Sequence, residues 1–291
     1  MKARAAAVTA TEIAAIVLRH LKEKAEARFG ATIRRAVLTV PVLTTPAVRD
    51  AMVRAGQRAG LEVIRTVQEP VAGAVAQGAT PQAPPFAVYD FGGGTFDAAV
   101  VRGNGRGLEV LASGGDDCLG GDDLDAAFGR WIANGLWKIR RLDVMKDAAL
   151  WSRIMRQCEA VKRALSTAPA VRYHLKNAFR DLQPDLDIVV RREHLQAPWG
   201  ELVERSLAST RETVERSGLP QDKLAGVLLI GGTTHVDQVR SAVSAMFGGK
   251  TLLEKEPQTA VARGAAIVAV KPEVVGEPPA APPVSPVRRV G

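Results

Sequence analysis

The sequence has few aromatic residues and few cysteines, and both shortages limit what the protein can be. Aromatic residues make up 4% of its 291 residues, so a core must rest on Val, Leu, Ile and Ala. No basic stretch is interleaved with aromatic residues, which argues against the stacking platforms of single-strand nucleic-acid binders. The two cysteines, Cys118 and Cys158, lie far apart and form no C-x-x-C pair. They therefore indicate neither a metal site nor an oxidising compartment.

Long hydrophobic runs are also missing. The apolar residues near the N-terminus recur at helical spacing and are interrupted by Arg, His and Lys, which is typical of neither a secretion signal nor a membrane span. We therefore expect a cytoplasmic protein. The formal net charge is +8, but basic and acidic residues are interspersed, so we expect no nucleic-acid and no membrane partner. The length allows two compact domains.

The order of periodic segments predicts an α/β protein with a mixed sheet. Strands alternate with helices, and three consecutive strands joined by glycine-bearing turns indicate an antiparallel meander. Thr9 followed by Glu12 fits a capping box that opens the first helix. The predicted helices cover residues 9–29, 45–59, 71–77, 124–137, 144–165, 202–217, 236–247 and 257–270. The predicted strands cover residues 36–40, 61–67, 86–91, 95–101, 108–113, 171–175, 186–190 and 224–230.

The clearest chemical signal is the stretch DFGGGTFD, residues 90–97, between two predicted strands. Three glycines let backbone N–H groups turn toward one point, which makes an anion-binding concavity. A carboxylate beside a polyphosphate is repelled unless a cation lies between them, so Asp90 and Asp97 predict Mg²⁺ bound through water. The alternative is a glycine hairpin with two surface aspartates, and the flanking Asp residues with Thr95 favour phosphate over it.

Two further glycine sites follow along the chain. In GGDDCLGGDDLD, residues 114–125, paired glycines before a helix leave N–H groups free for phosphate or ribose, although the acidic cluster fits ordinary helix-start charges equally well. In LLIGGTTH, residues 228–235, a buried strand runs into two glycines and a helix. That arrangement is typical of a nucleotide pocket, but many α/β folds have such a turn.

Taken in order, the three glycine sites resemble the nucleotide-binding domain of the seventy-kilodalton heat-shock chaperones, of the DnaK and HscA kinds. Other stretches agree with this resemblance, which runs from about residue 9 to residue 269. It implies an actin-like ATPase (ribonuclease H-like) fold. VLTVP at 37–41 resembles the segment that leads to the family's first connecting motif, EPVAGAVAQG at 69–78 resembles that motif, and AVARGAA at 260–266 resembles the second connecting helix. CEAVKRALS at 158–166 is similar to the adenosine-clasping helix.

The resemblance also implies ligands, ATP or ADP with Mg²⁺, and a role for each matching residue. Asp90 and Asp97 would organise Mg²⁺ and its waters. Glu69 would position the attacking water or a metal-bound water and couple the pocket to the connecting helix. The implied catalytic set is Glu69, Asp90, Thr95 and Asp97. The implied nucleotide-binding residues are Gly92, Gly93, Gly94 and Thr95 for the phosphates, Gly120 and Gly121 for phosphate or ribose, Glu159, Lys162, Arg163 and Ser166 for ribose and adenine, and Gly231, Gly232 and Thr233 for the adenosine from the other side.

The sequence departs from the family pattern at several points. The family's first phosphate loop, an aspartate-bearing strand followed by glycine and paired threonines, has no counterpart, and neither has its catalytic lysine. His235 stands in place of an arginine, and Gln258 in place of an acidic residue. We therefore expect an adenine-nucleotide-binding module of a DnaK-type chaperone with weak or lost hydrolysis. The alternatives are a competent ATPase completed by upstream sequence and a non-catalytic interaction protein that keeps the fold.

The predicted organisation follows from the same resemblance. We expect residues 1–85 to form an incomplete first lobe whose strands have unpaired edges, and residues 86–256 a complete second lobe. Residues 257–270 would form a helix returning to the first lobe, and residues 271–291 a disordered Pro-rich tail. The implied partners are an adenine nucleotide and a co-chaperone or nucleotide-exchange factor.

Overall fold

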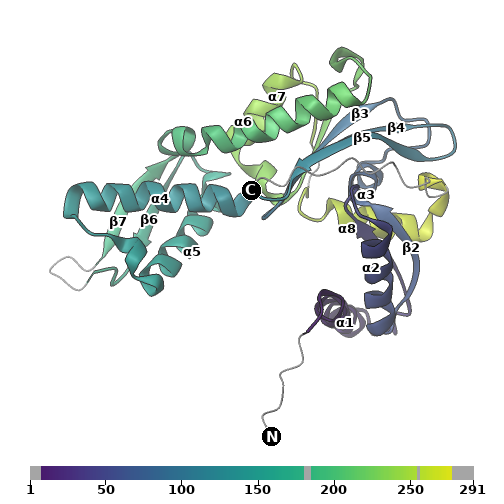
Figure 1. The fold of residues 1–291 in the computed structure, drawn as a ribbon, viewed down its shortest axis with the longest axis horizontal. Coiled ribbons are helices and arrows are strands. Elements are labelled where there is room, and N and C mark those ends of the chain that lie inside the picture. The colour runs from purple at the N-terminus through teal and green to yellow at the C-terminus, as the bar shows by residue number, and fades with distance from the viewer. Residues whose placement is uncertain (1–7, 180–184, 254–255, 277–291) are drawn as a thin grey trace, which may run out of the picture. The chain divides into compact units, whose positions relative to one another are not determined.

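The computed structural model describes residues 8–179, 185–253 and 256–276, whose helices and strands Figure 1 labels. These residues group into two compact units. Unit 1 comprises Met1–Pro84, Val101–Val110 and Thr259–Gly291, and unit 2 comprises Pro85–Val100 and Leu111–Gln258. Among the described residues, every helix is too short or too polar to cross a membrane.

Unit 1 is built around a parallel pair of strands. β1 (Arg35–Val40) pairs with β2 (Glu62–Gln68), from Arg35 opposite Glu62 to Val40 opposite Gln68. Within the described part of the chain, no third strand joins this sheet. The helices of the unit are α1 (Ala10–Phe29), α2 (Pro46–Arg58), α3 (Glu69–Ala76) and α8 (Ala260–Val270).

The first helix begins as the sequence predicts. The Glu12 N–H donates to Thr9 Oγ1 over 3.3 Å, and the Thr9 N–H donates to Glu12 Oε2 over 2.9 Å, so the capping box is confirmed. Gly30, with φ of +63°, ends the helix in the left-handed conformation that favours glycine. Ala15 is buried, whereas five apolar side chains of α1 are more than half exposed: Ile13, Ile16, Val17, Leu21 and Phe29.

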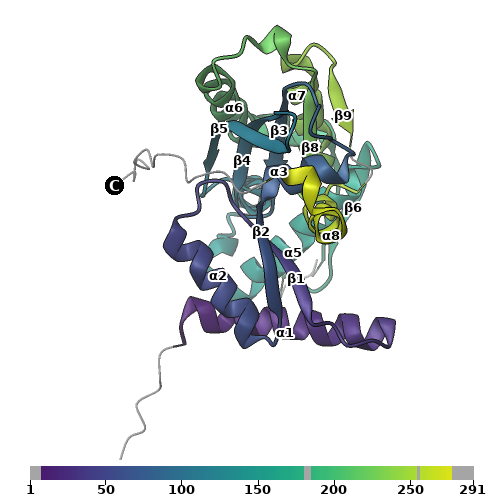
Figure 2. The same ribbon diagram turned by 90° about the vertical axis from the view of Figure 1, so that its right-hand side faces the viewer.

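Helices α3 and α8 of unit 1 pack closely because a glycine lies at their contact. A Cβ at Gly264 would lie 1.7 Å from the carbonyl oxygen of Ala72, so any side chain there would push the helices apart. Figure 2 shows α8, in yellow, beside α3. Helix α8 also contacts β1, which ties the end of the described chain to the small sheet.

The central sheet has five strands in the order β5-β4-β3-β8-β9. β3 pairs in parallel with β8, and β8 in parallel with β9. The connections between β3, β4 and β5 are too short for a parallel crossover, so these three strands form an antiparallel meander. The mixed α/β sheet is thereby confirmed. Its strands are β3 (Phe86–Phe91), β4 (Phe96–Gly103), β5 (Leu108–Asp116), β8 (Val227–Ile230) and β9 (Thr251–Leu253).

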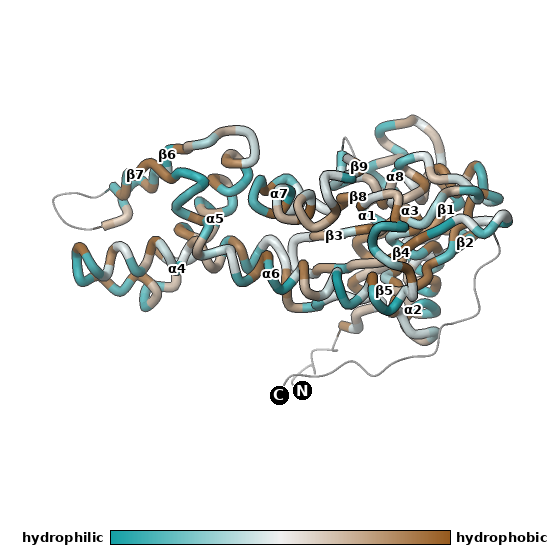
Figure 3. The backbone as a smooth tube through the Cα atoms, turned by 90° about the horizontal axis from the view of Figure 1, so that it is seen from above, coloured by the Kyte–Doolittle hydropathy of each residue, from teal (hydrophilic) through white to brown (hydrophobic). Residues whose placement is uncertain are grey.

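The helices and hairpin of unit 2 bury one continuous apolar core. Hydrophobic residues recur along α4 between hydrophilic ones, as Figure 3 shows in brown and teal, because only one face of this helix is buried. The antiparallel pair of β6 (Ala170–Leu175) and β7 (Leu186–Arg191) is confirmed. The helices are α4 (Gly121–Arg140), α5 (Ala148–Leu165), α6 (Arg192–Arg216) and α7 (Asp237–Met246), with 3-10 turns η1 (Val144–Lys146), η2 (Gln221–Lys223) and η3 (Gly232–His235).

Several predicted boundaries in unit 2 are wrong. The helix predicted over 144–165 is interrupted, because the Asp147 carboxylate accepts hydrogen bonds from the Ala149 and Leu150 N–H groups and starts α5 afresh. Helix α6 begins at Arg192 rather than at residue 202 and continues through Pro198, with the Trp199 side chain buried just after it. Strand β9 was not predicted, since its three residues are too short to show a period.

The predicted disordered tail is partly ordered where the structure describes it. Pro272–Val275 forms the 3-10 turn η4, and the Val275 side chain is buried. The Arg65 guanidinium donates to the carbonyl oxygens of Pro272, over 3.0 Å, and Gly276. A long-range contact to β2 thus holds a segment whose composition predicts disorder. Residues 277–291 of the predicted tail lie outside the described residues.

Candidate functional site

The glycine hairpin between β3 and β4 presents an exposed tip above buried aromatic side chains. The Gly92 N–H donates to the Thr95 carbonyl oxygen over 3.0 Å and closes the turn. Gly93, Gly94 and Thr95 are exposed, and among the described residues no protein acceptor takes the N–H of Gly93 or Gly94. Beneath the tip, three buried rings pack with centroids 4.7 to 6.0 Å apart: Tyr89, Phe91 and Phe96.

The second glycine site packs directly against this hairpin. A Cβ at Gly120 would lie 2.2 Å from the Gly93 carbonyl oxygen, so only glycine permits the approach. The Gly121 N–H donates to the Gly92 carbonyl over 3.0 Å, and the Asp122 N–H donates to the Gly93 carbonyl over 2.8 Å. The Gly120 N–H donates to Asp123 Oδ2 over 2.8 Å.

These bonds correct one prediction. The N–H groups at the start of α4 were expected to be free for phosphate or ribose, but the three described above are already paired within the protein. The reason is tertiary, because the hairpin carbonyls take the donors that a helix N-terminus otherwise leaves unsatisfied. Gly120 and Gly121 thus shape the site through close packing rather than through free donors.

The third glycine site joins the other two at Gly92. The Thr233 hydroxyl donates to the Gly92 carbonyl oxygen over 2.7 Å. Gly231 has φ of +82°, and a Cβ there would lie 2.6 Å from Asp90 Oδ1. The pairing of β3 with β8 places Asp90 opposite Ile230, which brings this turn beside the hairpin. Three segments that are distant in the sequence therefore meet at one point of unit 2.

Helix α5 supplies one wall of a groove beside this point. The groove has a volume of about 470 Å³, and the structure brings most of the predicted ribose and adenine residues to it. Glu159 and Arg163 are exposed and lie 3.9 Å apart, which makes a weak ion pair. The residues that line the groove are Gly93, Gly121, Asp122, Glu159, Lys162, Arg163, Ser166, Thr167, Gly232, Thr233, His235, Val236 and Gln258.

Lys162 has a partner that the sequence analysis missed. Its ammonium donates to Asp125 Oδ2 over 2.6 Å and to the Gly121 carbonyl over 2.7 Å, and both side chains of the ion pair are buried. Asp125 lies one turn after Gly121 on the buried face of α4, so the helical period could have marked it as a buried carboxylate that needs a partner. Burial raises the pKa of Asp125 to about 6, even though the Lys162 ammonium lowers it.

The two aspartates that flank the hairpin lie in different surroundings. Asp90 is half-buried at the end of β3, close to the turn at Gly231. Burial and the carboxylate of Asp117 raise the pKa of Asp97 to about 6. Gly115, another residue that the analysis missed, packs against Asp97, since a Cβ there would lie 3.1 Å from Asp97 Oδ1. No group of three or more metal-ligating side chains gathers within the described ranges.

Glu69 is the first residue of α3 and belongs to unit 1, whereas the other predicted site residues belong to unit 2. His235 lines the groove, and burial together with the nearby Arg240 guanidinium lowers its pKa. A neutral imidazole beside the groove offers a flat surface without the charge that an arginine would carry.

Comparison with known proteins agrees with this arrangement. The family model described as Hsp70 protein matches residues 1–273. The chain is 37% identical over 262 residues to the chaperone protein HscA homolog of Delftia acidovorans, which covers 90% of the chain and 41% of the relative. It is 39% identical over 259 residues to the HscA homolog of Pseudomonas fluorescens, covering 89% and 40%. It is 34% identical over 270 residues to chaperone protein DnaK 3 of Synechococcus, covering 90% and 41%.

The chain thus spans about two fifths of the length of these curated relatives. The glycine segments that meet at Gly92 lie within the matched residues, as do the elements that line the groove. With a family model over nearly the whole sequence and relatives above 30% identity, the chain belongs to the Hsp70 family.

Proposed function

We propose that unit 2 binds an adenine nucleotide, ATP or ADP, together with Mg²⁺, as the nucleotide-binding part of a DnaK-type chaperone. The observation that carries the proposal is the convergence of three glycine segments on Gly92, beside a groove of about 470 Å³. Exposed N–H groups of Gly93 and Gly94 suit phosphate oxygens, because successive backbone N–H groups make an anion-binding concavity. The adjoining groove suits the ribose and base.

The surroundings of the hairpin fit a divalent cation. Burial and the single neighbouring carboxylate of Asp117 raise the pKa of Asp97 to about 6, so its charged form is disfavoured where it lies. Mg²⁺ would compensate that charge and would neutralise phosphate oxygens at the same time. Asp90 and Asp97 would hold it through water, and the hairpin glycines with Thr95 would orient the β- and γ-phosphates.

The groove walls divide the remaining contacts. Glu159, Arg163 and Ser166 on α5 would contact ribose and base from one side, and Gly232 with Thr233 from the other. Two of the three Lys162 donors are already paired, so Lys162 would contribute at most one hydrogen bond to the nucleotide. The water-positioning role implied for Glu69 stays a proposal from family resemblance.

We further propose that hydrolysis by this chain alone is weak or absent. Phosphoryl transfer depends on donors and cations placed around the γ-phosphate before reaction. The sequence supplies one phosphate hairpin, at residues 90–97, and no second loop of aspartate, glycine and paired threonines. A co-chaperone or nucleotide-exchange factor as partner also rests on family resemblance.

One observation favours the alternative of an interaction protein that keeps the fold. Helix α1 exposes Ile13, Val17 and Leu21 at a spacing of four residues, so they form one apolar stripe on unit 1. Such a stripe marks either a contact surface or an aggregation hazard. This second function does not exclude the first, because the stripe and the groove belong to different units.

Calorimetric titration of the purified chain with MgADP and MgATP tests the proposed function. Asp90→Asn keeps the side-chain shape but removes a charge, so we expect it to weaken MgADP binding at least tenfold. The matched control is Asp222→Asn, which removes a charge from the exposed turn η2 of the same unit and leaves binding unchanged. A folded wild-type chain that gives no heat with either nucleotide contradicts the proposal and favours the interaction protein.

A further inference from the structure

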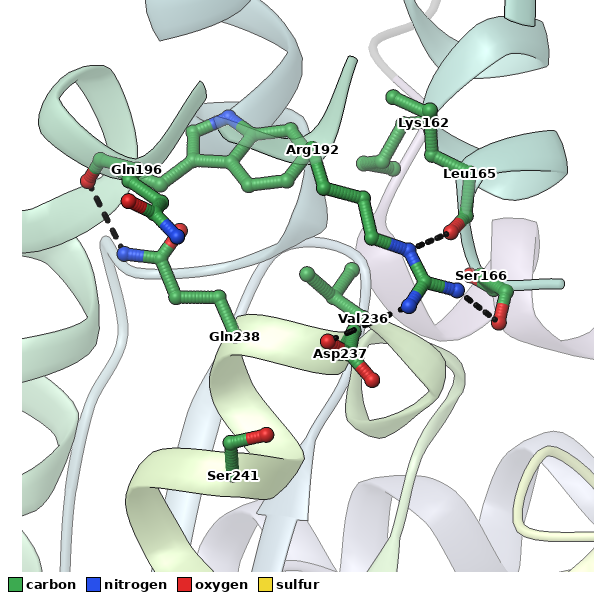
Figure 4. A pocket seen from close by; sticks show the side chains of 10 residues that line it. Lys162, Leu165, Ser166, Arg192, Gln196, Val236, Asp237, Gln238 and Ser241 are labelled. Carbon is green, nitrogen blue, oxygen red and sulfur yellow. Dashed lines mark hydrogen bonds and ion pairs between the residues drawn. The ribbon is translucent and has the colours of Figure 1, made fainter. Parts of the chain in front are cut away.

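Arg192, the first residue of α6, bridges three helices behind the groove (Figure 4). Its Nε donates to the carbonyl oxygen of Leu165 over 2.8 Å, and its Nη2 donates to that of Ser166 over 3.2 Å. Its Nη1 lies 3.3 Å from the Asp237 carboxylate at the start of α7. One guanidinium thus contacts α5, where that helix ends, and α7, where that helix begins.

The three contacts of the Arg192 guanidinium depend on properties that a lysine side chain lacks. The last carbonyl groups of a helix have no partner within the helix, and a cation near that end is favoured by the helix dipole. A carboxylate at the start of a helix is favoured for the same reason with the opposite sign. The planar guanidinium fork reaches two carbonyls and a carboxylate at once, whereas an ammonium is a point charge.

The two elements that Arg192 joins, α5 and α7, each adjoin a different wall of the groove. Ser166 caps α5 and lines one wall, and Val236, which directly precedes Asp237, lines the opposite wall. Arg192 itself lies in a second cavity of about 400 Å³, whose lining shares Lys162, Ser166 and Val236 with the groove (Figure 4). The guanidinium therefore acts from behind the walls and is not among the residues that line the groove.

We propose that Arg192 is a positioning residue that fixes the separation between the α5 wall and the Val236 wall, and so sets the affinity for the nucleoside part of the ligand. The inference rests on the proposed function. The proposal assigns the two parts of the ligand to different segments of the protein. Binding of the phosphates depends on the hairpin at Gly92–Gly94, whereas binding of the ribose and base depends on the separation of the two groove walls that Arg192 holds together. Loss of the Arg192 contacts widens the groove and leaves the hairpin at Gly92–Gly94 unchanged.

Titrations of Arg192→Ala with MgADP and with magnesium pyrophosphate test this separation. We expect MgADP affinity to fall roughly tenfold, the scale of one charge-assisted contact, with pyrophosphate affinity unchanged. Arg192→Lys restores the charge without the fork and regains only part of the loss. The matched control is Arg191→Ala, which removes the same charge one residue earlier from an exposed position and leaves both affinities unchanged.

Amide hydrogen exchange of the nucleotide-free chain supplies a readout that does not need the ligand. The N–H groups of Ser166 and Thr167 donate to α5 carbonyls, and that of Val236 donates to Thr233. Arg192→Ala should speed exchange at both wall ends, whereas Arg191→Ala should not. If amide exchange in Arg192→Ala is unchanged at either wall, the proposal that Arg192 holds the two walls together is overturned.

The outcomes separate the two proposals. A wild-type chain that binds MgADP while Arg192→Ala binds it equally well overturns the positioning role and leaves the proposed function standing. An equal loss of MgADP and pyrophosphate affinity also overturns it, because it reveals a general structural defect. A wild-type chain that binds neither ligand overturns the proposed function, and the nucleoside role of Arg192 with it.

Discussion

The buried ion pair of Asp125 and Lys162 in the groove wall should make the stability of unit 2 depend on pH in a way that mutation can isolate. The side chains of Asp125 and Lys162 are 6% and 10% exposed, and their charged atoms lie 2.6 Å apart. Asp125 Oδ1 is buried without a hydrogen-bond partner within the described structure. Removing Lys162 therefore leaves a carboxylate with neither oxygen paired, and a buried pair broken in this way costs about 3–5 kcal/mol.

The cost should depend on whether Asp125 is ionised. Burial raises its pKa from the usual 3.8 to about 6, and loss of the Lys162 ammonium raises it further. A carboxyl with a raised folded-state pKa favours folding at low pH, and that advantage is lost as pH rises through the folded pKa. At pH 8 we therefore expect Lys162→Met to cost about 3 kcal/mol, and at pH 5, where Asp125 is protonated, about 1 kcal/mol or less.

A double-mutant cycle with urea unfolding at both pH values measures this. All four tryptophans lie between residues 131 and 199, inside unit 2, so their fluorescence reports on that unit. Asp125→Asn should also lower the free energy of unfolding by about 3 kcal/mol at pH 8, because it leaves the Lys162 ammonium buried without a carboxylate partner. The double mutant Asp125→Asn/Lys162→Met should lose less stability than the two single mutants added together. The coupling energy should be about 2 kcal/mol at pH 8 and should vanish at pH 5. An equal coupling at both pH values refutes the reasoning.

Three further predictions concern other parts of the chain. Gly264→Ala should destabilise unit 1 by about 1–3 kcal/mol, because its methyl group meets the Ala72 carbonyl; faster amide exchange in α3 and α8 checks this, and unchanged exchange contradicts it. One thiol, the exposed Cys118, should react with a thiol reagent in the native chain, and two in urea, because Cys158 is buried with its pKa raised to about 12. Gly231→Ala should weaken MgADP binding at least tenfold, since φ of +82° and contact with the hairpin both oppose a side chain. Calorimetric titration with MgADP, at the same folded fraction of variant and wild type, checks this, and an unchanged affinity contradicts it.

Much of the local structure could be read from the sequence, because its signals are local. The capping box at Thr9 depends on residues three apart, and the hairpin at Gly92–Gly94 on adjacent glycines. The parallel pairing of β3 with β8 agrees with buried apolar runs that each end at a glycine turn. Hydrophobic period and turn chemistry suffice for such elements.

Other features could not be read in this way, because their partners lie far away in the chain. The start of α6 is held by buried Leu195 and Trp199 on either side of Pro198, against the local preference of proline. The turn at Pro272–Val275 is held by Arg65 from β2. The sequence analysis predicted no helix before residue 202 in the first case, and composition predicted disorder in the second.

The sequence by itself predicted the phosphate residues, since glycine, aspartate and threonine at those spacings carry their chemistry locally, whereas the predicted ribose and base residues at 159–166 rest on the family resemblance. Only the tertiary structure decided how those residues are used. It brought the Gly121 N–H and the Thr233 hydroxyl to the Gly92 carbonyl, so that N–H groups at the start of α4 are hydrogen-bonded within the protein. It also paired Lys162 with Asp125. The physical reason is that a hydrogen-bonding group is defined by its partner, and packing alone settles which partner a distant segment supplies.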